Sequence, residues 1–138
     1  MLTRRVSLML ALLAASAPGG AGVLVAQSSA PAGWQETPAS VLKGALRSVT
    51  AAQERYRATH GAYAASVDQL GVRPESGVHV EILLAGATGW QAKATHATQP
   101  GRSCVVFVGA LGDIEAPRTD ADREMAGEEG IPLCDRMR

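Results

Sequence analysis

The sequence predicts a small α+β domain, in which a long N-terminal helix packs on a three-stranded antiparallel meander and a disulfide closes a C-terminal loop. Three observations predict this fold. Apolar residues recur at spacings of three and four between residues 38 and 60, as in an amphipathic helix. Three short β-type runs follow between residues 78 and 108. Two cysteines, Cys104 and Cys134, bracket the last part of the chain.

The first 26 residues have the pattern of a secretory signal peptide. Two arginines begin it, an apolar run covers residues 6–17, and a proline with two glycines follows. Small or apolar residues at positions 24–26, before Gln27, suit cleavage by signal peptidase. The alternative is a retained membrane anchor, because residues 6–26 carry no charge and are long enough to span a bilayer. We therefore expect a secreted or periplasmic protein, with an inner-membrane anchored form as the alternative.

Charge and composition exclude some kinds of partner. The chain has 13 basic and 13 acidic residues, and loss of the two N-terminal arginines leaves 11 − 13 = −2. Without a basic surplus, and with only five aromatic residues (two Trp, two Tyr, one Phe), nucleic-acid binding is not expected. Membrane contact is expected only through an uncleaved N-terminus. Residues 27–37 are polar and contain proline and glycine, which indicates a linker.

Local signals give the bounds of the helices. Thr37 can cap a helix whose first residue is Pro38, and Gly61 can end it in a left-handed conformation. A helix of this length in so small a domain can bury only one face. Ser66 then predicts a single helical turn that Gly71 ends. The apolar stripe of the long helix consists of Leu42, Ala45, Leu46, Val49, Ala52 and Tyr56.

Three strands are expected at residues 78–84, 90–96 and 104–108. The first two alternate in polarity, and the third is a continuous β-branched and aromatic run. Short glycine-containing turns between them predict antiparallel neighbours. Ala92 and Ala94 would let the long helix approach the sheet closely.

An even number of cysteines in an exported chain predicts a disulfide between Cys104 and Cys134. The alternative, a pair of metal ligands or redox thiols, has little support, since no Cys-x-x-Cys pair occurs and no histidine lies near either cysteine in sequence. Residues 109–131 are glycine-rich and charged without a period, which indicates a long surface loop. A short polar tail, residues 136–138, follows the domain.

The acids of that loop are the candidate metal ligands. Oxygen ligands that alternate along a loop suit a hard cation such as Ca²⁺. The pattern lacks the glycine and the final glutamate of an EF-hand, and Arg118 and Arg123 are placed to pair with the acids. A solvated charged loop is therefore the preferred interpretation, and calcium, the one possible cofactor, is the alternative. The candidate ligands are Asp113, Asp120, Asp122 and Glu124.

The sequence points to no catalytic residues. It contains no Gly-x-Ser-x-Gly, no Ser-x-x-Lys and no phosphate-binding glycine loop. His60, His79 and His96 lack the spacing of metal ligands, so structural roles are expected for them. The chain is therefore not expected to be an enzyme. The alternative is a small secreted enzyme or inhibitor that uses loop 109–131, with a pocket lined by His96 and the loop acids.

One further pattern consists of five short groups of residues along the chain: Ala52–Tyr56, His60–Tyr63, Val67–Gly71 and Trp90–Ala92, together with the pair Cys104 and Cys134. Through this pattern, residues 38–135 resemble the globular part of type IV pilins and of type II secretion pseudopilins. The resemblance implies the helix, meander and disulfide-closed loop in this order. It also implies a possible calcium site, because major pseudopilins bind calcium in a comparable C-terminal loop.

The chain departs from that family at its N-terminus. It has no prepilin-peptidase site, and prolines and glycines interrupt the stretch that forms one continuous helix in pilins. We therefore expect a pilin-like protein exported without the polymerising helix, with a structural or binding role toward an unidentified protein or cell surface. The alternative is a minor pilin or pseudopilin subunit held by an uncleaved N-terminal anchor.

Overall fold

The computed structural model describes residues 36–110, 112–123 and 126–137. The predicted signal peptide or anchor at residues 1–26 and nearly all of the predicted linker lie outside the described residues. The same holds for Glu124, one of the four candidate calcium ligands.

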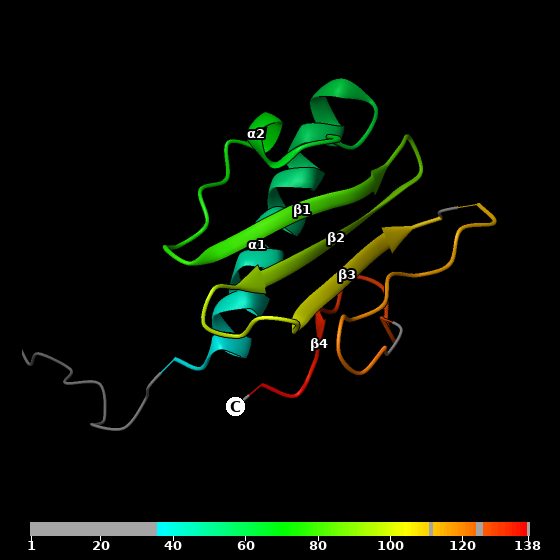
Figure 1. Ribbon diagram of the computed structural model, residues 1–138. Coiled ribbons are helices and arrows are strands. Elements are labelled where there is room, and N and C mark those ends of the chain that lie inside the picture. The colour runs from blue at the N-terminus through cyan, green and yellow to red at the C-terminus, as the bar shows by residue number, and fades with distance from the viewer. Residues whose placement is uncertain (1–35, 111, 124–125, 138) are drawn as a thin grey trace, which may run out of the picture. The chain divides into compact units, whose positions relative to one another are not determined.

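The described chain is an α+β domain, as predicted, with one antiparallel sheet in the order β1-β2-β3-β4 (Figure 1). The prediction of three strands was wrong by one. The two-residue strand β4 pairs with β3, and so short a strand shows no alternation in the sequence. The elements are α1 (Pro38–His60), α2 (Val67–Leu70), β1 (Val78–Ala85), β2 (Gly89–His96), β3 (Ser103–Gly109) and β4 (Leu133–Cys134).

Both ends of α1 follow from local sequence. The Thr37 hydroxyl oxygen accepts a hydrogen bond from the Ser40 N–H at 3.2 Å, which satisfies one of the free amides of the first turn. Gly61 ends the helix with a φ of 74°, a left-handed conformation that favours glycine. Between them one face is fully buried against the sheet, through Leu42, Leu46 and Val49.

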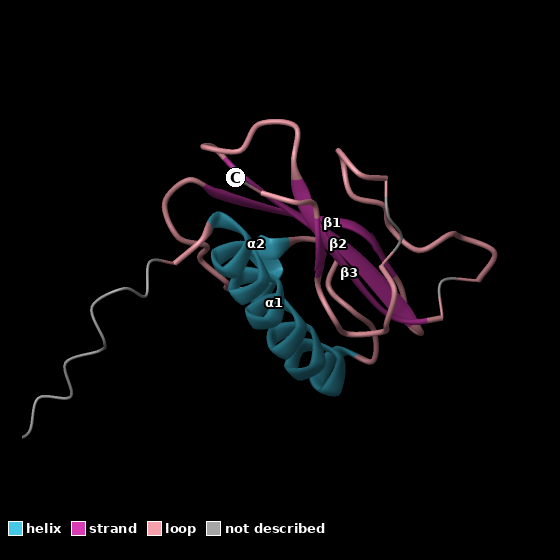
Figure 2. Ribbon diagram, turned by 90° about the horizontal axis from the view of Figure 1, so that it is seen from below, coloured by secondary structure: helices cyan, strands magenta, loops and turns pink. Residues whose placement is uncertain are grey.

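The core lies between α1 and one face of the sheet (Figure 2). Trp90, Ala92 and Ala94 of β2 have no exposed surface, and the two alanines leave room for the helix. Trp90 is the largest buried side chain, and its ring centre lies 6.4 Å from that of Tyr63. The small side chains of β2 therefore allow α1 to pack closely on the sheet, and Trp90 fills the core beside Tyr63.

The C-terminal segment covers the opposite face of the sheet, on the side away from α1 (Figure 2). Its expected character as a solvated surface loop is wrong in part, because Pro117, Thr119 and Ala126 are buried. The reason lies in β3: Val105 points away from the helix and is fully buried, so its face of the sheet needs an apolar cover. The described parts of the segment before β4, residues 112–123 and 126–132, supply that cover.

Gln53 joins α1 to the segment that follows it. Its side chain is fully buried and pairs with both backbone groups of Ala64: Nε2 donates to the Ala64 carbonyl at 2.9 Å, and Oε1 accepts from the Ala64 N–H at 2.7 Å. The side-chain amide of Gln53 thus makes the two hydrogen bonds that a neighbouring strand would make, at a residue that lies outside the sheet. This pairing fixes the exit of the chain from α1 toward β1.

Replacing Gln53 with alanine should lower the free energy of unfolding by about 3 kcal/mol, since two buried backbone groups lose their partners and a cavity opens. Urea unfolding followed by circular dichroism measures the loss. Gln53→Glu is the matched control, because it keeps the acceptor but loses the donor at neutral pH. The free energy of unfolding of Gln53→Glu should come closer to that of the wild type in acid, because the protonated carboxyl can donate to the Ala64 carbonyl. A Gln53→Ala variant as stable as the wild type would show that the pairing contributes nothing.

Candidate functional site

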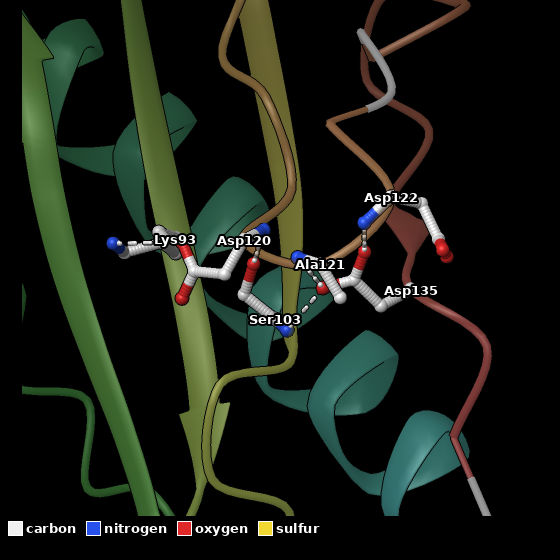
Figure 3. A network of polar contacts seen from close by, with 6 residues as sticks. All are labelled: Lys93, Ser103, Asp120, Ala121, Asp122 and Asp135. Atoms are coloured by element: carbon white, nitrogen blue, oxygen red, sulfur yellow. Dashed lines mark hydrogen bonds and ion pairs between the residues drawn. The ribbon is translucent and has the colours of Figure 1, made fainter.

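The most organised polar group of the described chain is Asp135, which directly follows β4 (Figure 3). Its side chain is buried and accepts three backbone hydrogen bonds. Oδ2 accepts from the N–H of Ser103 at 2.8 Å and of Ala121 at 3.0 Å, and Oδ1 accepts from the N–H of Asp122 at 2.8 Å. One carboxylate thus ties the start of β3 to the middle of the C-terminal loop.

These contacts hold the pKa of Asp135 below its ordinary value of 3.8. Burial alone would raise the pKa, but the N–H donors of Ala121, Asp122 and Ser103 stabilise the ionised form and lower it. No cation takes part in these three bonds, and the Thr119 side chain adds to the lowering of the pKa. The arrangement is suited to holding a loop in place.

Further bonds extend the network to Arg136. The Ser103 hydroxyl accepts from the Asp120 N–H at 2.8 Å, and the Asp135 N–H donates to the Ser103 carbonyl at 2.9 Å. Asp122 Oδ2 accepts from the Arg136 N–H at 3.0 Å, and the Arg102 guanidinium donates to the Arg136 carbonyl. The predicted polar tail is therefore fastened to the domain through its first residue.

The candidate calcium ligands occupy separate positions. Asp120 forms an ion pair with Lys93 at 3.3 Å (Figure 3). Asp122 Oδ2 accepts a hydrogen bond from the backbone N–H of Arg136. Asp113 is exposed, and Arg118 pairs with Glu115 at 3.2 Å, not with a candidate ligand. Within the described ranges, no group of three or more His, Cys, Asp or Glu side chains is placed to hold a metal ion.

The predicted disulfide between Cys104 and Cys134 is confirmed. The two residues lie directly opposite each other in the β3–β4 register. Cys104 is fully buried on the helix side of the sheet, and Cys134 Sγ lies 4.0 Å from the Ala39 carbonyl in the first turn of α1. A disulfide of this kind is typical of proteins in oxidising, extracytoplasmic compartments.

The histidines and the loop acids do not form one site. His96 Nδ1 contacts the Thr98 hydroxyl at 2.8 Å and accepts from the Thr98 N–H at 3.1 Å. By the alternation of β2, His96 belongs to the helix face of the sheet, whereas Lys93 and its partner Asp120 lie on the other face. His60 Nδ1 stays within its own helix, 2.9 Å from the Tyr56 carbonyl, and His79 is exposed on β1.

Comparison with known proteins leaves the family open. No protein-family model matches the chain, and no curated protein matches it. A search of the described helices finds none with the length and apolar character needed to cross a bilayer. The description of the site therefore depends on the structure alone. It consists of a cross-strand disulfide and a buried carboxylate, which together hold the C-terminal segment in place.

Sequence reasoning missed Asp135, although it singled out four other acids in the neighbourhood. In the sequence Asp135 is one acid beside a cysteine, and its three donors come from residues 103, 121 and 122. The one available signal was its position next to Cys134. The predicted disulfide places residue 135 near residue 103, where a carboxylate can reach free amides.

Proposed function

We propose that the chain is an extracytoplasmic, pilin-like domain with a structural or binding role and no catalytic activity. The observation that carries the proposal is the order of elements: a long helix across an antiparallel meander, followed by a C-terminal segment closed by a disulfide. The resemblance noted in the sequence implies the same order. The engagement of the loop acids by Lys93 and by backbone amides favours a scaffold role for this segment.

The proposal leaves two forms to be distinguished. In the first, export removes residues 1–26 and a free binding domain remains. In the second, the N-terminus is retained and the domain is a minor subunit of a pilus or pseudopilus. The missing prepilin-peptidase motif favours the first form.

Fractionation of cells with N-terminal sequencing of the native protein tests the proposal. A free domain should be found in the periplasm or medium with a mature N-terminus near Gln27. An anchored subunit should stay in the membrane fraction with an intact N-terminus and co-purify with filament components. Recovery of the intact chain from the cytoplasm, without membrane association, would contradict both forms.

A further inference from the structure

The strand β1 forms one edge of the sheet, because the order is β1-β2-β3-β4 (Figure 1). The pairing with β2 shows which of its backbone groups point outward. The Gly77 carbonyl accepts from Ala97 at one end, and the Gly86 N–H donates to Gly89 at the other. Since bonded and non-bonded pairs alternate along an antiparallel ladder, His79 and Glu81 bond to β2. Val78, Val80 and Ile82 therefore direct their N–H and C=O groups away from the sheet.

Most of these outward groups have no partner among the residues that the structure describes. The Val78 N–H donates to the Glu75 carbonyl at 3.0 Å. No hydrogen bond from any described residue reaches the outward N–H or C=O of Val80 or Ile82. A β-bulge between Ile82 and Leu84 ends the regular ladder. The free edge is thus a stretch of about five residues, which is enough for a short added strand.

A cavity of about 490 Å³ runs along this edge. Val78–Ile82 form one wall, and α2 with the segment after it forms the other, through Val67, Val72 and Pro74. Because consecutive residues of β1 line it, the cavity faces the strand edge itself and not one face of the sheet. A groove between a strand edge and a helix is suited to an extended peptide, which can pair its backbone with the edge.

The charges at the groove define the peptide further. Asp68 and Glu81 line it, and none of the described residues that line it is a lysine or arginine. Both carboxylates are exposed, and neither forms an ion pair with a described residue, since Lys93, the cross-strand neighbour of Glu81, pairs with Asp120. The groove is complementary to a cationic ligand.

We propose that the β1 edge binds an extended peptide segment of a partner protein with alternating apolar and basic residues. The peptide adds a fifth strand beside Val80 and Ile82. Its apolar side chains turn toward Val67 and Val72, and its basic side chains turn toward Glu81. The inference rests on the proposed binding role, but its test uses purified protein, so a negative result here would leave the outcome of fractionation and sequencing unchanged.

The test is an NMR titration in which the capped peptide Val-Lys-Val-Lys-Val-Lys is added to the ¹⁵N-labelled protein. The protein is purified in the form that accumulates in cells. We expect the amide signals of Val80 and Ile82 to shift and their hydrogen exchange to slow. Two control peptides isolate the two parts of the interaction. The first control peptide is N-methylated at alternate amides and cannot form the hydrogen bonds to the strand edge. The second, Val-Glu-Val-Glu-Val-Glu, has the opposite charge. Each control peptide should bind at least about tenfold more weakly than the lysine peptide.

The matched variant is Asp68→Lys with Glu81→Lys, which changes two exposed side chains and leaves the core intact. It should bind the lysine peptide about tenfold more weakly and should prefer the glutamate peptide. Thermal unfolding of the variant checks that the fold survives. Any of three results would overturn the proposal. The amide signals of Val80 and Ile82 do not shift, the N-methylated peptide binds as well as the unmodified one, or β1 pairs with a second copy of the chain in place of the peptide.

Discussion

Replacing Asp135 with alanine should lower the free energy of unfolding by about 4 kcal/mol, because three charge-assisted hydrogen bonds are lost together. The Ser103 N–H would be left buried without an acceptor, and the N–H groups of Ala121 and Asp122 would lose theirs. Urea unfolding at neutral pH measures the loss. In hydrogen exchange, the amides of Ala121 and Asp122 should lose protection before those of β1 and β2.

The control for this variant is Asp120→Ala, which removes a partly exposed ion pair with Lys93. Pairs of this kind contribute less than about 1 kcal/mol, so the Asp120 variant should stay close to the wild type. Asp135→Asn keeps one oxygen but turns an N–H₂ group toward backbone donors, and it should recover only part of the stability. Equal stabilities of the Asp120 and Asp135 alanine variants would contradict the role assigned to Asp135.

The same carboxylate predicts how stability depends on pH. The folded-state pKa of Asp135 lies below 3.8, the ordinary value expected for the unfolded chain. The stabilisation is therefore fully present above that ordinary value and is lost as the pH falls toward the lower, folded-state pKa. The difference in stability between the wild type and Asp135→Ala should accordingly be constant near neutrality and shrink in acid.

Removal of the disulfide is the second large effect expected. The bond closes a loop with a sequence separation of 30 residues. Chain-entropy arithmetic for a loop of that length gives about 3.6 kcal/mol, and we expect the Cys104→Ala, Cys134→Ala double variant to lose a comparable amount. Urea unfolding of the variant, beside the oxidised wild type, measures the loss.

Reduction of the wild type provides the control for that experiment, because it breaks the bond without changing the side-chain volume. Reduced wild type and double variant should unfold at similar urea concentrations, both well below the oxidised protein. If the reduced protein matched the oxidised one, the strand pairing and Asp135 alone would hold the C-terminal segment.

Local signals in the sequence predicted a large part of the fold. The cap at Thr37, the proline after it and the glycine at position 61 gave the bounds of α1. Ser66 and Gly71 gave those of α2, where Ser66 and Gln69 form a capping box. In each case the physical cause lies within four residues, so the pattern is visible without a structure.

The missed features depend on contacts between distant residues. The strand β4 is two residues long and exists because Leu133 and Cys134 pair with β3. The bulge in β1 interrupts what the sequence presents as a regular alternation. Gly109 is the first residue of the predicted loop, yet a Cβ at this position would collide with the Thr88 carbonyl oxygen. None of these constraints leaves a periodic signal.

The candidate site was predicted only in part, again because some of its contacts join residues that are distant in the sequence. The disulfide follows from the count of cysteines and the signal-like N-terminus. The acids of the loop were recognised as a group, but their partners could not be, because Lys93 lies in β2 and the amides that bind Asp135 come from two distant segments. The sequence shows which residues carry a charge. Which of these charges are stabilised by backbone N–H groups depends on the folded structure.

One measurement tests most directly the claim that this is an oxidised extracytoplasmic domain: intact-mass analysis of the native protein, denatured in a thiol-alkylating reagent without prior reduction. We expect a chain that begins near Gln27, is lighter by two hydrogen atoms than its sequence requires and carries no alkyl group. A chain that retains residues 1–26 and carries an alkyl group on both Cys104 and Cys134 would contradict it.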